Sequence, residues 1–403
     1  MSEAINQHWH FAIVGAGLSG VCLAVLLARE QPQWNILLID SQAPEAAPDH
    51  RASALSASTV DVLQSMGLWS TLVTQTAAIT GIDVSDRGHI GSASLDAREQ
   101  SLSAYGYVVE NAHLASVFAT ALAKYPSITH ISSTAPRLIK PRRNGMSLTL
   151  EEGEYLADLV VIAGGEHRSL AEKLGITYRH YDYQRAALVA NLTMTEAHEG
   201  LAHERFTGDG AIALLPLPGE TGKRVSLVWT LPPEQAEKMQ TAAPEEFIRC
   251  LNQQLGSRVG AALEVAYRQC FPVKKVIAAE QVRSHLLLLG NAAHSMHPVA
   301  GQGFNLTVRD MATLTELLAK AHDEGIAPGD LGVLQRYAKL RKDDQGRTIA
   351  LSDKLPKLFG MNEPLAMVAR NIGLVTLDLL PPLRQSFARF GAGLMARRAH
   401  LRE

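Results

Sequence analysis

The residues of this chain best suited to chemistry lie in the Gly-rich stretch 290–305, which includes Gly290, Asn291, His294 and His297. Four consecutive leucines, 286–289, precede the stretch, and a segment with helical periodicity follows it and ends near Ala321. A buried strand that stops in a Gly-rich loop and reopens as a helix presents free backbone N–H groups to an anion. The pattern therefore predicts a binding site for an anionic cofactor.

A second Gly-rich loop follows the apolar residues 11–14 and reads Gly15-x-Gly17-x-x-Gly20. In this fingerprint the first glycine permits the tight turn, the second lets the backbone approach a pyrophosphate, and the third brings helix and strand close. Asp40 ends the next predicted strand, 35–40, where an acid is expected to bind a ribose hydroxyl. Two cofactor loops in one chain indicate a flavoprotein.

The bulk composition excludes several classes of protein. The net charge is −2 over 403 residues, so nothing suggests a nucleic-acid partner. Three scattered cysteines show no CxxC spacing, which is typical of a reducing cytoplasm. For His294 and His297 we favour loop histidines bonded to backbone over metal ligands. We find no signal peptide, and the most apolar candidate span, 372–383, is interrupted by Asp378 and by two prolines. We expect a cytoplasmic protein, at most peripheral to the inner membrane.

The order of predicted elements indicates an α/β fold, with a Rossmann-like cofactor domain interrupted twice by a mixed β-sheet substrate domain. The cofactor domain is predicted to comprise residues 1–77, 105–185 and 280–345. The substrate domain is predicted to comprise 78–104 and 186–279, and we expect it to cover the flavin. Residues 346–403 are helix-like, Pro-punctuated and basic, and form a C-terminal helical segment.

Apolar residues recur at helical spacing within that segment, at Leu383, Phe387, Phe390 and Leu394. Two interpretations of this stripe remain open. The helix packs on the protein's own body, which we slightly favour, or it forms a basic amphipathic surface that meets lipid or a partner subunit.

With these motifs the chain resembles the class A flavoprotein aromatic hydroxylases, the para-hydroxybenzoate hydroxylase-like family, over essentially its whole length. More narrowly it resembles the hydroxylases of ubiquinone biosynthesis. Three segments look most like the 2-polyprenyl-6-methoxyphenol hydroxylase branch: residues 84–89, Glu204-Arg205-Phe206-Thr207, and Asn291 in Gly290-Asn291-Ala292-Ala293.

The resemblance implies a role for each matching residue. Gly15, Gly17 and Gly20 would hold the FAD pyrophosphate, and Asp40 the adenosine ribose. Asn291 stands where many relatives have an aspartate that contacts the diphosphate-ribityl region. Gly301, Gly303, Phe304 and Asn305 would lie beside the isoalloxazine, on a helix whose N-terminus favours anionic reduced flavin. The remaining candidates are Gly164 and Gly290 for the cofactor, and Arg51, His297 and Pro298 for catalysis near the flavin.

One motif departs from the family. Relatives have Asp-Gly-x-x-Ser after the buried strand 159–163, whereas this chain has Gly164-Gly165-Glu166-His167-Arg168. Three interpretations remain open. Ser169 replaces the serine after a one-residue shift, the lost carboxylate weakens cofactor binding or reduction, or Glu166 reaches in from nearby.

The resemblance also implies the reaction. NADH or NADPH would reduce FAD, O₂ would add at the flavin C4a position, and the hydroperoxide would transfer a hydroxyl group to the ring of a hydrophobic polyprenyl phenol in ubiquinone biosynthesis. Other proteins of that pathway are expected partners. Two rivals are a sister hydroxylase with another ring position or aromatic substrate, and a weakly active FAD-binding subunit of the biosynthetic complex.

Overall fold

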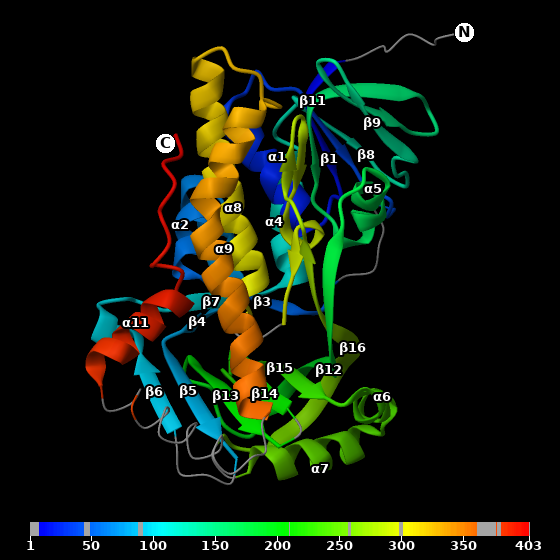
Figure 1. Ribbon diagram of the computed structural model, residues 1–403. Helices are drawn as coiled ribbons and strands as arrows, with labels where there is room; N and C mark the ends of the chain where they lie inside the picture. Colours follow the sequence, from blue (N-terminus) through cyan, green and yellow to red (C-terminus); the bar gives the residue numbers. More distant parts are fainter. Residues whose placement is uncertain are drawn as a thin grey trace.

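A computed structural model describes residues 8–43, 49–87, 92–208, 210–256, 259–297, 301–360, 376 and 380–402. The chain forms two lobes, each built on an eight-stranded sheet. In Figure 1 the first lobe lies above the second, and the long helix α9 (Leu331–Gly360) extends from the first lobe down to the second. The fold is α/β with mixed sheets, as the sequence predicted.

The first sheet has the strand order β17-β18-β11-β1-β2-β8, and the hairpin β9–β10 extends it from β11. Its parallel core is formed by β1 (His8–Val14), β2 (Ile36–Ile39), β8 (Ile128–Ile131), β11 (Glu154–Ile162) and β18 (Leu286–Leu288). The central residues of β1, β2, β11 and β18 are buried, because both faces of the sheet are covered there, which explains their apolar runs. Strand β8 lies at the edge of the sheet, and its two central residues are exposed.

Helices cover one face of this sheet. They are α1 (Leu18–Glu30), α2 (Ala57–Ser65), α4 (Asn111–Leu122) and α8 (Gln302–Asp323), and they share one apolar cluster with the sheet. Cys22 is fully buried in that cluster. The opposite face packs against β9 (Leu138–Arg142), β10 (Gly145–Thr149) and the short helix α5 (Arg168–Lys173).

The second sheet has the order β19-β16-β12-β15-β14-β13-β5-β6. Its strands are β5 (Gly81–Asp86), β6 (Ser92–Asp96), β12 (Tyr178–Met194), β13 (Leu201–Thr207), β14 (Gly210–Pro216), β15 (Arg224–Leu231), β16 (Ala262–Ala278) and β19 (His294–Ser295). Helices α6 (Pro233–Thr241) and α7 (Pro244–Leu255) pack on the face turned away from the first lobe (Figure 1). We did not predict these two helices from the sequence.

A third, three-stranded sheet joins the lobes and was also not predicted. It has the order β3-β7-β4, with β3 (Ala52–Ser56), β4 (Thr76–Ile79) and β7 (Gly106–Glu110). The apolar residues 107–109 lie within β7, and α4 begins directly after that strand, at Asn111. Pairing with β3 and β4, which are distant in sequence, decides the conformation of this segment.

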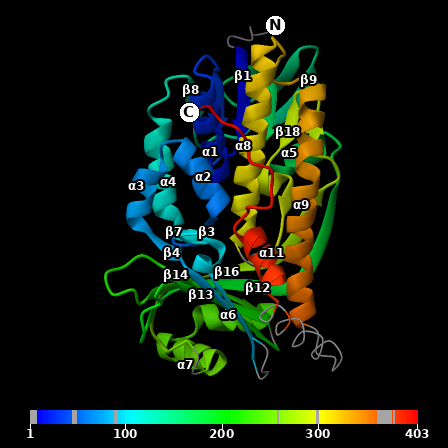
Figure 2. The same cartoon turned by 90° about the vertical axis from the view of Figure 1, so that its left-hand side faces the viewer.

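The C-terminal region packs on the body of the protein. Helix α9 is continuous across position 346, and α11 (Pro381–Gly391) lies against the third sheet. Phe387 and Leu394 pack against the apolar cluster that α11 forms with the third sheet. Leu383, at the other end of the stripe, is exposed. The final residues run back along the first lobe (Figure 2). There Arg397 bonds Glu316 through both terminal nitrogens, each at 2.8 Å.

No helix among the described residues is long and apolar enough to cross a membrane. The apolar segment 372–383 lies largely outside the described residues.

The glycines of the first loop give a paired prediction about stability. A β-carbon at Gly20 would lie 1.8 Å from the Gly15 carbonyl oxygen, whereas one at Gly17 would meet nothing within 4 Å. We expect Gly20→Ala to lower the free energy of unfolding of the flavin-free protein by about 3 kcal/mol, because helix and strand must separate. Gly17→Ala, the matched control, should stay within about 0.5 kcal/mol. Urea unfolding measures both, and equal stabilities would contradict the predicted packing.

Candidate functional site

Four parallel strands of the first sheet end at the same level. Val14 pairs with both Ile39 and Ile162, and Ile162 pairs with Leu288. The segments that leave these strand ends carry Asp40, Gly15, Gly164 and Gly290. The parallel register therefore brings together the two Gly-rich loops, the ribose-type acid and the divergent 164–168 motif, at the edge where such sheets bind ligands.

The loops are in close contact there. A β-carbon on Gly15 would lie 3.0 Å from the backbone nitrogen of Gly164, and one on Gly290 would lie 3.5 Å from the Ser19 hydroxyl. Gly15 and Gly290 also have positive φ angles, +105° and +57°, which favour glycine. The two Gly-rich loops therefore lie side by side at this edge of the sheet.

Two helices point their N-termini at this site, and neither has a side-chain cap. Helix α1 starts after Gly17 and α8 starts after Gly301. A β-carbon at Gly17 or Gly303 would meet nothing within 4 Å, so the space before both helices is open. Uncapped N–H groups, the helix dipole and open space suit a phosphate-bearing ligand.

Asp40 braces the first loop while keeping capacity for a ligand. Its Oδ2 accepts a hydrogen bond from the Ala16 backbone N–H at 2.6 Å, and its Oδ1 accepts one from Gln42 N–H at 2.7 Å. Each carboxylate oxygen can accept a second bond, and the side chain is only partly buried. The arrangement fits FAD, because a carboxylate suited to a ribose hydroxyl and an open helix N-terminus suited to a pyrophosphate lie side by side.

At the divergent motif, the carboxylate of Glu166 fills the place of the family's aspartate. A β-carbon on Gly164 would lie 2.3 Å from Glu166 Oε1, so this carboxylate lies where a side chain at 164 would start. Ser169 is exposed on α5. Arg168 donates instead to the Asn291 carbonyl oxygen, from Nε at 3.0 Å and from a terminal nitrogen at 2.6 Å. The geometry favours the interpretation in which Glu166 reaches in.

Asn305 has its whole side chain engaged within the protein. Its Oδ1 accepts from Ser56 N–H and the Thr59 hydroxyl, at 2.8 and 2.7 Å. Its Nδ2 donates to the carbonyl oxygens of Ala54 and Gly301, at 2.7 and 2.9 Å. An amide has four such capacities, so the contribution of Asn305 to a ligand falls to its backbone N–H. The side chain ties α8 to β3.

Arg51 lies at the junction of the lobes, just before β3. It forms an ion pair with Asp49 at 2.7 Å, and its guanidinium stacks 4.9 Å from the Phe271 ring of the second sheet. The Asp49 hydrogen bond raises the pKa of Arg51 further, so the group is cationic at all relevant pH values. Arg51 is linked to the 301–305 segment only along β3, where Ala54 accepts a hydrogen bond from Asn305. The guanidinium of Arg51 itself bonds Asp49.

His297 is buried, and burial lowers its pKa to about 4, so the imidazole is neutral. Its ring meets Tyr183 edge-on at 5.2 Å. The Tyr183 hydroxyl donates to Asp353 at 2.6 Å, and Lys275 pairs with the same carboxylate at 2.8 Å. The described residues contain no cluster suited to a metal. Pro298 lies outside the described residues.

A buried charge network, which we did not predict, connects the second Gly-rich loop to α8 and α9. Asp310 accepts from His294 Nε2 at 3.2 Å, from Arg341 Nε at 2.5 Å and from Gln345 at 3.0 Å. Burial would raise the pKa of Asp310, but His294 and Arg341 hold it below its usual value. The partners lie 16 and 31 positions from Asp310, so no local motif announces this network.

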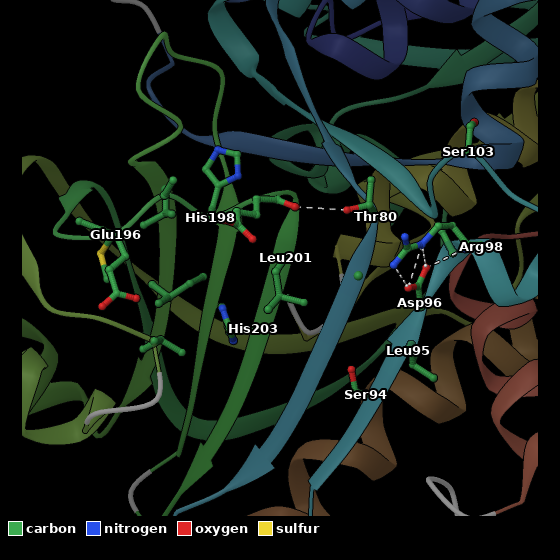
Figure 3. Close-up of a pocket in the computed structure, with 18 residues that line it drawn as sticks. Thr80, Ser94, Leu95, Asp96, Arg98, Ser103, Glu196, His198, Leu201 and His203 are labelled. Atoms are coloured by element: carbon green, nitrogen blue, oxygen red, sulfur yellow. Dashed lines mark hydrogen bonds and ion pairs between the residues drawn. The ribbon is translucent and has the colours of Figure 1, made fainter.

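A cavity of about 610 Å³ lies elsewhere, over β5, β6 and β13 (Figure 3). Leu201 and His203 line it from β13, and Asp96 and Arg98 lie opposite. Leu214 and Val225 of this lining belong to the apolar cluster under α6 and α7. This cavity is therefore on the face of the second sheet that is turned away from the Gly-rich loops.

Comparisons with known proteins agree with this geometry. The profile of the FAD binding domain family matches residues 9–347. The chain is 33% identical over 393 residues to the ubiquinone hydroxylase UbiL of Rhodospirillum rubrum, across 95% of this chain and 89% of that protein. It is 28% identical to the 3-demethoxyubiquinol 3-hydroxylase of Escherichia coli, across 96% and 100%. The p-nitrophenol 4-monooxygenase PnpA of Pseudomonas putida shares the fold, with a TM-score of 0.78 at 19% identity over 96% and 98%.

The buried network predicts a large effect of removing one partner. Arg341→Met leaves the Asp310 carboxylate buried without its main cation, and we expect a loss of about 3–5 kcal/mol in the free energy of unfolding. Arg336→Met, an exposed position on the same helix, is the control and should change stability by about 0.5 kcal/mol or less. Thermal and urea unfolding measure both. A loss no larger than the control's would mean that the network contributes little.

The position of Glu166 predicts an effect on cofactor affinity. Glu166→Ala should weaken FAD binding about tenfold, because it removes one charge-assisted hydrogen bond from a partly exposed site. The matched control is Glu172→Ala on the exposed side of α5, which should bind FAD normally. Quenching of FAD fluorescence gives both dissociation constants.

Gly164→Asp tests whether a carboxylate on residue 164 can replace that of Glu166 in FAD binding. Alone it places a second carboxylate against Glu166, whereas in the Glu166→Ala background it should recover the lost affinity. Equal affinity of the two alanine variants would instead support the interpretation in which the carboxylate contact is simply lost.

Proposed function

This chain belongs to the FAD-binding family of flavoprotein aromatic hydroxylases, and we propose that it uses NADH or NADPH and O₂ to hydroxylate the ring of a polyprenyl phenol in ubiquinone biosynthesis. The observation that carries the FAD site is the convergence of four strand ends and two uncapped helix N-termini on one edge. When bound there, FAD supplies the redox chemistry that activates O₂. The residues of the chain bind, orient and shield the reactants.

The roles of the protein residues follow from their positions. The first turn of α1 binds the pyrophosphate, Asp40 the ribose, and the backbone at the start of α8 the flavin ring. Arg51 and neutral His297 both lie where the first lobe meets the second sheet, against Phe271 and Tyr183 respectively. Because His297 keeps a pKa of about 4, it carries no charge at neutral pH, and it leaves the site apolar enough to exclude water from the reaction.

The substrate class rests on the relatives and on the character of the second lobe. The curated relatives are named as a ubiquinone hydroxylase and a 3-demethoxyubiquinol 3-hydroxylase. We assign a substrate of the same chemical class, a phenol with an isoprenoid tail, and within that class the 2-polyprenyl-6-methoxyphenol type. The apolar face of the second sheet suits such a ring. The exposed Leu383 side of α11 is where we place contact with a membrane that supplies the tail.

Two alternatives follow from specific observations. One relative is named for hydroxylation at position 3 of the ring, whereas the name of the ubiquinone hydroxylase UbiL gives no position, so a sister hydroxylase acting at another carbon is the nearest rival. The absence of the family acid at Gly164 suggests a weakly active FAD-binding subunit. The carboxylate of Glu166, 2.3 Å from the β-carbon position of Gly164, argues against that second rival.

The visible spectrum of the purified protein tests the redox half of the proposal. We expect a bound-flavin band that bleaches under anaerobic NADH or NADPH and returns when air is admitted. Addition of a short-tailed 2-prenyl-6-methoxyphenol should then give a product heavier by one oxygen atom, which mass spectrometry with ¹⁸O₂ identifies.

The other outcomes separate the rivals. Flavin that neither nucleotide bleaches, with or without the phenol, would favour the weakly active subunit. Oxygen incorporation into a different phenol, or at a different carbon, would favour the sister hydroxylase.

A further inference from the structure

A carboxylate that the roles above leave unused lies near the middle of the second sheet, on Glu204 of β13. Strand register aligns Glu204 with Val84 on β5 and with Ala213 on β14. The same row continues to Val228 on β15 and to Val189 on β12. Side chains directly opposite one another across paired strands share one face of a sheet. Glu204 therefore projects from the same face as these four small apolar residues.

This face is turned toward the FAD-binding lobe. Asn191, two residues along β12 from Val189, donates a hydrogen bond to the His50 carbonyl oxygen at 3.0 Å. Phe271, opposite Ala187 of β12, packs under Arg51. Residues 50 and 51 lead into β3. Asn305, in the segment 301–305 proposed to lie beside the flavin, forms hydrogen bonds with the backbone of β3. Glu204 thus belongs to the wall that faces the proposed flavin ring, and the 610 Å³ cavity lies on the opposite wall.

The two faces of the sheet differ in how completely they are covered. On the face under α6 and α7, Ile212, Leu214 and Leu227 are 0–2% exposed. On the Glu204 face, their neighbours Ala213 and Val228 keep accessible surface although they lie in central strands. Helix α9 packs against β13 and β14 on this side, yet it does not fill the space in front of them. An apolar surface with residual access in the centre of a sheet suits a planar aromatic ligand.

The Glu204 carboxylate is paired with no cation in the part of the chain that the structure describes. Among the described residues, no hydrogen bond or ion pair to its carboxylate is found, and burial raises its pKa to about 7. A carboxyl group in an apolar site without a partner costs stability, and such groups cluster at functional sites. A pKa near neutrality is also the value at which a carboxylate is most effective as a proton acceptor at physiological pH.

We propose that Glu204 is a catalytic residue that binds the phenol hydroxyl of the substrate and accepts its proton. This role of Glu204 rests on the proposed ring hydroxylation, because the ring is attacked more readily once the phenol has lost its proton and become electron-rich. The phenol O–H bond breaks and an O–H bond forms on the Glu204 carboxylate, while the electron pair stays on the substrate oxygen and enriches the ring. Once the ring carbon has gained its hydroxyl group from O₂, it loses its hydrogen to water as a proton, and the C–H electron pair restores the aromatic ring. Glu204 then returns the proton to the substrate oxygen.

The surroundings select a neutral phenol over other aromatics. The small side chains beside Glu204 accept a flat ring, and the carboxylate repels substrates that carry their own carboxylate in that place. A phenol whose hydroxyl is methylated has no hydrogen to donate and leaves Glu204 without a partner.

The turnover experiment compares Glu204→Gln with the wild type on the FAD-loaded enzyme. The matched control is His203→Gln, which lies next to Glu204 on the same strand and points to the opposite face, where it pairs with Asp83 at 3.7 Å. With an ordinary short-tailed methoxyphenol, Glu204→Gln should lose product formation about 100-fold or more. The control should keep the wild-type rate, and FAD affinity should be unchanged in both.

The readout specific to proton transfer is the acidity of the substrate. A ring-fluorinated analogue that is already ionised at the assay pH needs no proton acceptor. With it, the deficit of Glu204→Gln should shrink at least tenfold. If Glu204→Gln loses the same fraction of its rate with the acidic and the ordinary phenol, Glu204 is not the proton acceptor and only helps to shape the binding surface.

Binding separates failure of this inference from failure of the proposed function. Quenching of flavin fluorescence measures dissociation constants for the methoxyphenol and for its O-methyl ether without turnover. The wild type should bind the phenol about tenfold or more tightly than the ether, and Glu204→Gln should lose most of that preference. Absence of product with the preference intact would overturn hydroxylation alone. No preference in the wild type would overturn the assignment of Glu204.

Discussion

The site depends on one constraint, the parallel register that holds four strand ends of the first sheet at a common level. Hydrogen bonds between Val14, Ile39, Ile162 and Leu288 and their neighbours fix that level. The segments that follow can therefore only meet at one edge. A shift of any strand by one residue would turn its apolar side chains toward the wrong layer, so burial of the core protects the geometry of the cofactor site.

The second requirement is a fixed relation between the lobes, and polar groups provide it. Asn305 connects α8 to β3 through all four of its hydrogen-bonding capacities. Asp310 connects α8 to α9 and to the His294 segment. Buried polar groups of this kind are costly unless every partner is in place. They therefore favour one arrangement of the two lobes over others with the same apolar contacts.

Two carboxylates in this chain differ in their solvation, and this difference determines the chemical role that we propose for each. Glu166 occupies the space left by Gly164 and stays partly exposed, so it can bond a hydroxyl group of a cofactor. Glu204 stands among apolar neighbours on a partly accessible face, and burial raises its pKa to about 7. The same functional group is thus suited to hydrogen bonding at one site and to proton transfer at the other, because solvation differs between them.

The sequence by itself determined the features that depend on neighbours along the chain. The strand–loop–helix at 11–30, Asp40, and the glycines at 290–303 are local patterns whose geometry follows from backbone conformation. Tertiary structure decided the rest. It formed the third sheet, joined Arg51 to Asp49, satisfied Asn305 internally, and placed the Glu166 carboxylate against Gly164. It alone shows that Glu204 faces the flavin lobe while His203 faces away, since sheet order and register, set by distant strands, decide which side of a strand is inside.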